Sequence, residues 1–227
     1  MIVENVPNVV ITFAPLVGIL LFAAPSYFAI IRQRKLTGII ILVALGIYAL
    51  AIETVAIKTG LPYGEFTYTN TLGPKLLDTT PYAVALAYPP ILLMGFWLAS
   101  KFTRNFRRVF IAAIFATLVD VVLDPATVKL EFWSWAEAGS FYGVPWINFI
   151  GWLLTGIIGA TILHFLWGKA ERVKAPVAYS GFGVLLFWTG VNAGIDQKVP
   201  LAVGAVYSLI ILGIILLEKQ QFKNEHE

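Results

Sequence analysis

The 227-residue sequence contains no cysteine and only two histidines. The lack of cysteine excludes disulfide bonds, thiolate metal sites and a cysteine nucleophile. Charged residues are also scarce: Asp, Glu, Lys and Arg together make up 13% of the chain, whereas 59% is hydrophobic. The mean hydropathy of +0.81 exceeds what the surface of a soluble domain normally carries. The composition therefore predicts an integral membrane protein.

Seven apolar runs, each about 17–23 residues long, could cross the hydrocarbon core of a bilayer as helices. They lie near residues 9–31, 36–58, 81–100, 107–123, 146–168, 175–195 and 199–217. We therefore expect an all-α fold, a polytopic transmembrane bundle of about seven helices. Residues 1–227 are expected to form a single integral membrane domain in the cell membrane. The opening MIVENVPN has no basic residue, so we expect the first run to be a retained helix rather than a signal peptide.

Lysine and arginine are divided unequally between the two sides of this predicted bundle. Twelve follow the odd-numbered runs: Arg32, Arg34, Lys35, Lys101, Arg104, Arg107, Arg108, Lys169, Arg172, Lys174, Lys219 and Lys223. The other side holds only Lys58, Lys75, Lys129 and Lys198. Because cytoplasmic loops are enriched in Lys and Arg, we expect the N-terminus outside and the C-terminus in the cytoplasm. The net charge of +3 follows this topology, so the expected partner is the lipid bilayer and not nucleic acid.

Two long connections, at about residues 59–80 and 124–145, fall on the predicted outer side. Both are rich in aromatic residues, and their Pro and Gly residues favour turns. A single Trp or Tyr at this place is typical of the membrane interface. Their number within two connections instead favours an aromatic pocket.

Three acidic residues fall within or at the ends of the predicted spans, where ionisable groups are costly and usually functional. Glu53 lies near the outer end of the second span, and Asp120 and Asp124 lie near the outer end of the fourth. A spacing of four residues places the two aspartates on one helix face. Two carboxyl groups held close in a poorly hydrated site cannot easily both ionise, so one can serve as an acid and another as a base. The competing interpretation is structural, with Asp124 capping a loop and Glu53 tying two helices together.

Two further polar residues lie in the fifth span. Asn148 lies near its outer end, where it could hydrogen-bond a carboxyl group or a water, although a plain contact between helices is an equally good interpretation. His164 lies near the cytoplasmic end of the same span, opposite the acids. We therefore do not expect it to take part in the same chemistry.

The second connection and its flanks resemble a known family, the membrane-bound carotenoid biosynthesis hydratases, which act on acyclic carotenoid ends. The resemblance runs through residues 120–152, DVVLDPATVKLEFWSWAEAGSFYGVPWINFIGW. The matching motif residues are Asp120, Asp124, Pro125, Trp133, Trp135, Tyr142 to Pro145, Asn148, Phe149, Gly151 and Trp152. Upstream, the pattern is also matched by Glu53, Gly60, Pro62, Tyr63, Gly64 and Tyr68.

The resemblance implies addition of water across a terminal double bond of a membrane-dissolved acyclic carotenoid, giving a tertiary alcohol. Such a reaction needs a general acid, a base and surroundings that tolerate a carbocation. It implies Asp120 or Asp124 as the acid, and Glu53 or the other aspartate as the base. Facing aromatic rings could stabilise the cation by about 2 kcal/mol or more. The substrate-binding residues it implies are Tyr63, Tyr68, Trp133, Trp135, Tyr142, Asn148 and Trp152. No cofactor and no metal is expected, because the reaction is redox-neutral.

Two other functions stay open at the level of the sequence. The Asp120-x-x-x-Asp124 spacing is that of a carboxylate pair holding magnesium on a prenyl diphosphate in intramembrane prenyltransferases. Against this, there is no second Asp-rich motif and few outer basic residues to meet a diphosphate. A proton-coupled transporter would also use buried acids. A retinal photoreceptor is disfavoured, because the seventh span has no mid-membrane lysine for a Schiff base.

Overall fold

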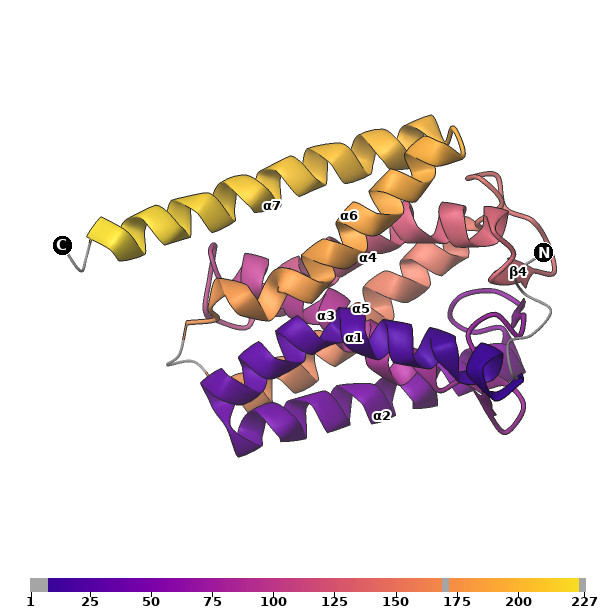
Figure 1. The fold of residues 1–227 in the computed structure, drawn as a ribbon, viewed down its shortest axis with the longest axis horizontal. Helices are drawn as coiled ribbons and strands as arrows, with labels where there is room; N and C mark the ends of the chain where they lie inside the picture. Colours follow the sequence, from indigo (N-terminus) through magenta and orange to yellow (C-terminus); the bar gives the residue numbers. More distant parts are fainter. Residues whose placement is uncertain (1–7, 169–171, 225–227) are drawn as a thin grey trace.

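The computed structural model describes residues 8–168 and 172–224. Within these ranges the chain forms seven α-helices (Figure 1). They are α1 (Asn8–Arg34), α2 (Leu36–Thr59), α3 (Ala83–Ala99), α4 (Arg107–Lys129), α5 (Trp146–Trp167), α6 (Tyr179–Gly194) and α7 (Lys198–Asn224). A short 3-10 helix, η1 (Ala175–Ala178), leads into α6. Each predicted apolar run overlaps one of the helices, which confirms the prediction of a helical bundle.

Five helices are long and apolar enough to cross a membrane, namely α1, α2, α4, α5 and α7. The chain is thus a multi-pass membrane protein. Helix α3 has 17 residues and α6 has 16. Helix α3 packs against α1, α2, α4 and α6, and every residue from Tyr88 to Ala99 is buried. A helix that is apolar all round suits such a central position.

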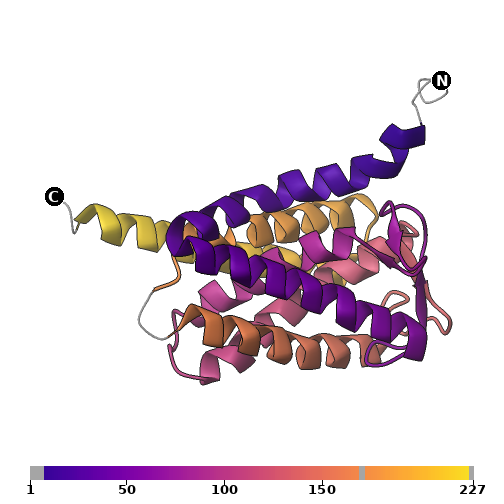
Figure 2. The same ribbon diagram turned by 90° about the horizontal axis from the view of Figure 1, so that it is seen from below.

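The helices run alternately in opposite directions, so α1 begins and α7 ends at opposite ends of the bundle (Figures 1 and 2). Both long connections lie at one end, here called the loop end (residues 60–82 and 130–145). The short turns after α1 and α3 lie at the other, here called the basic end. Lys169, one of the basic residues used to predict sidedness, lies outside the described residues. The orientation of the two ends across the membrane stays a prediction.

Helices α3 and α4 approach each other closely at a glycine. A Cβ atom on Gly95 would lie 2.6 Å from the carbonyl oxygen of Ala112. Small residues at such crossings let two backbones pack directly, which is the usual means of helix association in a membrane. This contact fixes α4, which carries both aspartates, against the central helix.

The loop end contains four short strands that were not predicted from the sequence. Strand β1 (Phe66–Tyr68) pairs antiparallel with β4 (Trp133–Trp135), with Phe66 opposite Trp135 and Tyr68 opposite Trp133. Strands β2 (Lys75–Leu76) and β3 (Thr80–Pro81) form a hairpin within the first connection. The alternation of aromatic residues in β1 and β4 is the period-two pattern that could have indicated strands. Pairing of β1 with β4 joins the two connections into one layer.

Candidate active site

The two aspartates of α4 are joined through an asparagine of α5. Nδ2 of Asn148 donates hydrogen bonds to Oδ2 of Asp120, at 2.9 Å, and to Oδ2 of Asp124, at 2.6 Å. All three side chains are buried. Oδ1 of Asp120 is also buried and has no hydrogen-bond partner among the described residues. Because two carboxyl groups share one amide away from water, both cannot readily carry a charge.

Asp124 lies inside α4 and does not cap a loop. The helix continues through Pro125 to Lys129, so the side chain of Asp124 keeps the direction set by the helix. The carbonyl oxygen of Pro125 accepts a hydrogen bond from Nε2 of Gln197, at 3.0 Å. The loop-capping interpretation of Asp124 is therefore wrong.

Glu53 of α2 is held by a tyrosine of the first connection. The hydroxyl group of Tyr68 donates a hydrogen bond to Oε1 of Glu53, at 2.5 Å. Burial raises the pKa of the Tyr68 phenol well above its usual value, and the charges of Glu53 and Asp124 act in the same direction. Tyr68 therefore stays protonated and serves as a donor to the carboxyl group.

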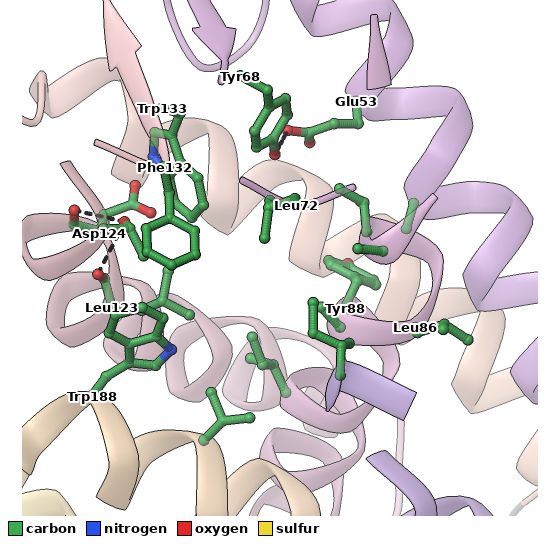
Figure 3. A pocket seen from close by; sticks show the side chains of 18 of the residues that line it. Glu53, Tyr68, Leu72, Leu86, Tyr88, Leu123, Asp124, Phe132, Trp133 and Trp188 are labelled. Atoms are coloured by element: carbon green, nitrogen blue, oxygen red, sulfur yellow. Dashed lines mark hydrogen bonds between the residues drawn. The ribbon is translucent and has the colours of Figure 1, made fainter. Parts of the chain in front are cut away.

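A cavity of about 580 Å³ separates Glu53 from Asp124 (Figure 3). Figure 3 shows the two carboxyl groups apart at the margin of the open space, Asp124 at the left and Glu53 at the top, with aromatic and aliphatic side chains around it. Its larger apolar and aromatic lining residues include Phe22, Tyr63, Phe66, Tyr68, Leu72, Tyr88, Leu123, Phe132, Trp133, Trp135, Trp152, Phe187 and Trp188. Apolar walls with a few convergent polar groups are typical of small-molecule sites, which commonly measure roughly 300–1,000 Å³.

Most of the residues singled out from the sequence meet at this cavity. Those that line it are Glu53, Asp124, Tyr63, Tyr68, Trp133, Trp135, Asn148 and Trp152. Asp120 does not line it and is linked to it through Asn148. Of the three acids, the structure therefore places Glu53 and Asp124 at the cavity wall and Asp120 behind Asn148.

Tyr142 lies apart from the cavity, although its motif suggested a substrate contact. Its hydroxyl group accepts a hydrogen bond from the backbone N–H of Val199, at 3.3 Å, and the residue is 37% exposed. The reason is local: Tyr142 has a positive φ of 51° in a tight turn closed by bridges between Gly139 and Gly143 and between Phe141 and Val144. This turn brings the tyrosine to α7 instead of the cavity.

Sequence reasoning missed several cavity residues, above all Tyr88, Phe132 and Trp188. The Tyr88 ring packs against Trp152 with centroids 5.9 Å apart, and its hydroxyl group donates to the carbonyl oxygen of Thr155, at 3.3 Å. A tyrosine within a long apolar run needs a buried hydrogen-bond partner, which is a usable signal. Phe132 and Trp188, packed edge to face at 5.9 Å, carry no such signal, because apolar rings are equally suited to face lipid.

Gly151 allows the first connection to lie directly on α5. A Cβ atom there would lie 2.7 Å from the carbonyl oxygen of Pro62 and 2.5 Å from Cδ1 of Tyr63. The hydroxyl group of Tyr63 donates to Oγ1 of Thr155, at 3.0 Å, and Nε1 of Trp135 donates to the carbonyl oxygen of Tyr63, at 2.9 Å. These bonds hold the aromatic layer over the cavity.

His164 lies at the basic end, as its position in the fifth span predicts. Its Nδ1 accepts a hydrogen bond from Nε of Arg108, at 2.8 Å. Nη2 of Arg108 donates to the carbonyl oxygens of His164, at 3.2 Å, and Gly168, at 2.8 Å. Arginine near the last carbonyl groups of a helix satisfies and stabilises its C-terminus. Neither residue lines the cavity.

A family model described as carotenoid biosynthesis protein matches residues 11–211 of the chain. The chain belongs to the carotenoid biosynthesis protein family. This confirms the resemblance seen in the sequence, and the matched range includes every residue of the candidate site. This carotenoid biosynthesis protein is also 35% identical, over 191 residues, to bisanhydrobacterioruberin hydratase of Haloarcula japonica. That alignment covers 80% of the chain and 63% of the relative, so the chain spans less than two thirds of it. No solved structure matches the chain significantly.

Proposed function

We propose that this carotenoid biosynthesis protein is a hydratase that adds water across a terminal double bond of an acyclic carotenoid, giving a tertiary alcohol. The observation that carries the proposal is the cavity itself. The buried carboxyl group of Asp124 on α4 and the partly buried one of Glu53 on α2 both line an apolar and aromatic space. The similarity to a protein named as a hydratase supports the same reaction class.

The proposed reaction begins with a proton donated by Asp124 to the less substituted carbon of the terminal alkene. The alkene π electrons form the new C–H bond and leave a tertiary carbocation. Water then attacks the cation through its oxygen, and Glu53 takes the proton that the oxygen loses. Exchange of that proton back to Asp124 through water restores the starting state, so the net change is one alkene and one water to one alcohol.

The assignment of these two roles follows from the hydrogen-bond partners. Asp124 and Asp120 share the amide of Asn148, which favours a pair that carries one proton and so can supply it. Glu53 accepts a hydrogen bond from Tyr68, and such a bond stabilises the ionised carboxylate that a base requires. Asp120 does not line the cavity, so we assign it to positioning and to proton sharing.

The aromatic walls suit the cationic intermediate. Trp133 and Tyr68 pack edge to face at 5.5 Å, and Trp152 lies beside Tyr88 at 5.9 Å. The negative faces of such rings attract a cation, with a gain of about 2 kcal/mol or more in a water-poor site. The same apolar walls limit the access of bulk water, so a single positioned water is the expected nucleophile.

The alternative of a magnesium-dependent prenyltransferase has less support from the geometry. Its diphosphate would need both aspartates at one metal ion, whereas only Asp124 lines the cavity. Carboxylates that hold magnesium together must reach the same ion. We expect hydration by the purified protein to be unchanged by EDTA. Magnesium-dependent transfer of a prenyl group from a prenyl diphosphate, with no hydration, would favour the prenyltransferase.

The decisive test is expression of the chain in a host that accumulates lycopene, followed by mass analysis of the pigment. The proposal predicts a mass gain of one water for each modified end. Glu53→Gln should abolish the gain, and Glu65→Gln, an exposed residue in the first connection, is its matched control. A membrane-inserted wild-type protein that leaves lycopene unchanged, and also fails on other acyclic carotenoids, would contradict the proposal.

A further inference from the structure

Helix α1 is packed into the bundle along only one of its halves. Toward the basic end, Ala23, Ser26 and Ile30 are buried, whereas none of residues 13–22 is. The backbone N–H of Ser26 donates to Oγ of Ser180, at 3.0 Å, and that of Ser180 donates to Oγ of Ser26, at 2.9 Å. Figure 2 shows α1 and α2 separating as they run from their shared turn toward the loop end. The half of α1 beyond the serine pair therefore contacts the bundle loosely.

The cavity of the candidate site extends beneath this loosely packed half. Five of its lining residues come from α1, namely Pro15, Gly18, Ile19, Phe22 and Ala23. The lining on the neighbouring helix α6 includes Phe187 and Trp188. The carboxyl groups and the outer surface of α1 and α6 are thus connected by one continuous space.

The rim of this space faces outward within the apolar part of the helices. Phe22 is 43% exposed and Phe187 is 53% exposed, and their rings meet edge to face with centroids 6.1 Å apart. Gly18 is exposed, and a Cβ atom on it would have nothing within 4 Å. Exposed apolar residues at mid-span contact lipid chains, so the cavity borders on the bilayer at this point.

The geometry points to a lateral portal between α1 and α6, gated by Phe22 and Phe187, through which the hydrocarbon chain of an acyclic polyisoprenoid reaches the carboxyl groups from the lipid. The identity of the chain rests on the proposed function. A cavity of about 580 Å³ encloses one end of such a molecule, while the rest stays between the helices and in the bilayer. Exposed side chains change rotamer within nanoseconds, so two phenyl rings can open without unfolding α1.

A hydrocarbon chain is the occupant that fits, because the path carries no charge until it reaches the site. Rim residues Gly18, Phe22 and Phe187 are all apolar, and the carboxyl groups lie at the inner end of the path. At the loop end, by contrast, the β1–β4 pair and its aromatic side chains form a layer over the cavity. A substrate that dissolves only in lipid therefore meets an apolar entrance at the depth where it resides.

The portal is tested first by narrowing it. Gly18→Trp places an indole at the rim, and Gly213→Trp on α7 is the matched control, since a Cβ atom on either glycine would have nothing within 4 Å and Gly213 does not line the cavity. We expect Gly18→Trp to slow lycopene hydration by about tenfold or more, as blocking of an entry step does, and Gly213→Trp to leave it unchanged. Equal rates for the two variants would overturn the portal and leave the hydratase proposal standing.

A binding readout separates the portal from the reaction. The photoreactive residue p-benzoylphenylalanine is incorporated at position 22 or, as a control, at position 213, and the protein is reconstituted in phosphatidylcholine vesicles containing tritiated squalene. Squalene is an unconjugated acyclic polyisoprenoid, and we expect it to label position 22 several times more than position 213. If position 22 is labelled preferentially but the protein hydrates no carotenoid, the portal proposal would stand and the hydratase proposal would be refuted. Equal labelling at both positions would refute the portal.

Discussion

Tyr68 and Glu53 are joined across the cavity wall by a 2.5 Å hydrogen bond, which couples strand β1 to α2. Tyr68 lies in β1, so its position depends on the pairing of β1 with β4. The arrangement gives the carboxyl group of Glu53 a fixed direction toward the cavity. It also makes the loop end part of the site and not merely its cover.

Removal of that hydrogen bond should impair the reaction without unfolding the protein. We expect Tyr68→Phe to lower the hydration rate by about 10–100-fold, which corresponds to the ~1.5–3 kcal/mol of a hydrogen bond to a charged group. Tyr82→Phe, at an exposed tyrosine of the first connection, is the matched control. Rates on lycopene in reconstituted vesicles measure the effect, and equal rates for both variants would show that the bond has no part in the reaction.

The two aspartates should differ in importance. Asp124 lines the cavity and is the proposed acid, so Asp124→Asn should reduce hydration by about 10²–10⁴-fold. Asp120→Asn should cost less, because Asp120 does not line the cavity. Asp78→Asn, at an exposed residue of the first connection, controls for the loss of a carboxylate. A greater loss for Asp120→Asn than for Asp124→Asn would reverse the roles assigned here.

How far the sequence predicts this site depends on the kind of residue. The helices and the Asp120–Asp124 face followed from apolar run length and helical spacing, both of which are local properties. That Phe22 and Phe187 line the cavity could not be predicted, because residues that face lipid and residues that line an apolar cavity have the same kinds of side chain. Tyr142, in contrast, was expected at the substrate site and lies apart from the cavity. A motif match gives no information on the turn that directs its side chain. The β1–β4 pairing depends on contacts between connections distant in sequence.

The amide of Asn148 should contribute to stability as well as to position. Its removal in Asn148→Ala leaves two buried carboxyl groups without their shared donor, at a cost of about 1–3 kcal/mol in the free energy of unfolding. The unfolding midpoint in detergent measures this change. Asn70→Ala, in an exposed part of the first connection, should leave the midpoint unchanged. A midpoint for Asn148→Ala that equals the wild-type value would mean that the carboxyl pair needs no donor.

Stability and activity should also depend on the close packing of Gly151 against the first connection. The methyl group added by Gly151→Ala would overlap Pro62 and Tyr63, so we expect a loss of about 1–3 kcal/mol in stability together with reduced hydration. Gly190→Ala is the control, because a Cβ atom there has nothing within 4 Å. Thermal unfolding and pigment analysis of the two variants test the prediction. It would be contradicted if Gly151→Ala were as stable and active as Gly190→Ala.

The absence of native cysteine allows the orientation of the bundle to be tested with single introduced thiols. Asp78→Cys places a thiol on an exposed residue of the loop end, and Gln221→Cys places one on an exposed residue of α7 near the basic end. The distribution of Lys and Arg predicts that the basic end faces the cytoplasm. A membrane-impermeant maleimide should therefore label the Asp78→Cys protein in intact cells and the Gln221→Cys protein only after permeabilisation. The reverse labelling pattern would mean that the loop end faces the cytoplasm. The positions of the cavity and its carboxyl groups within the fold would not change.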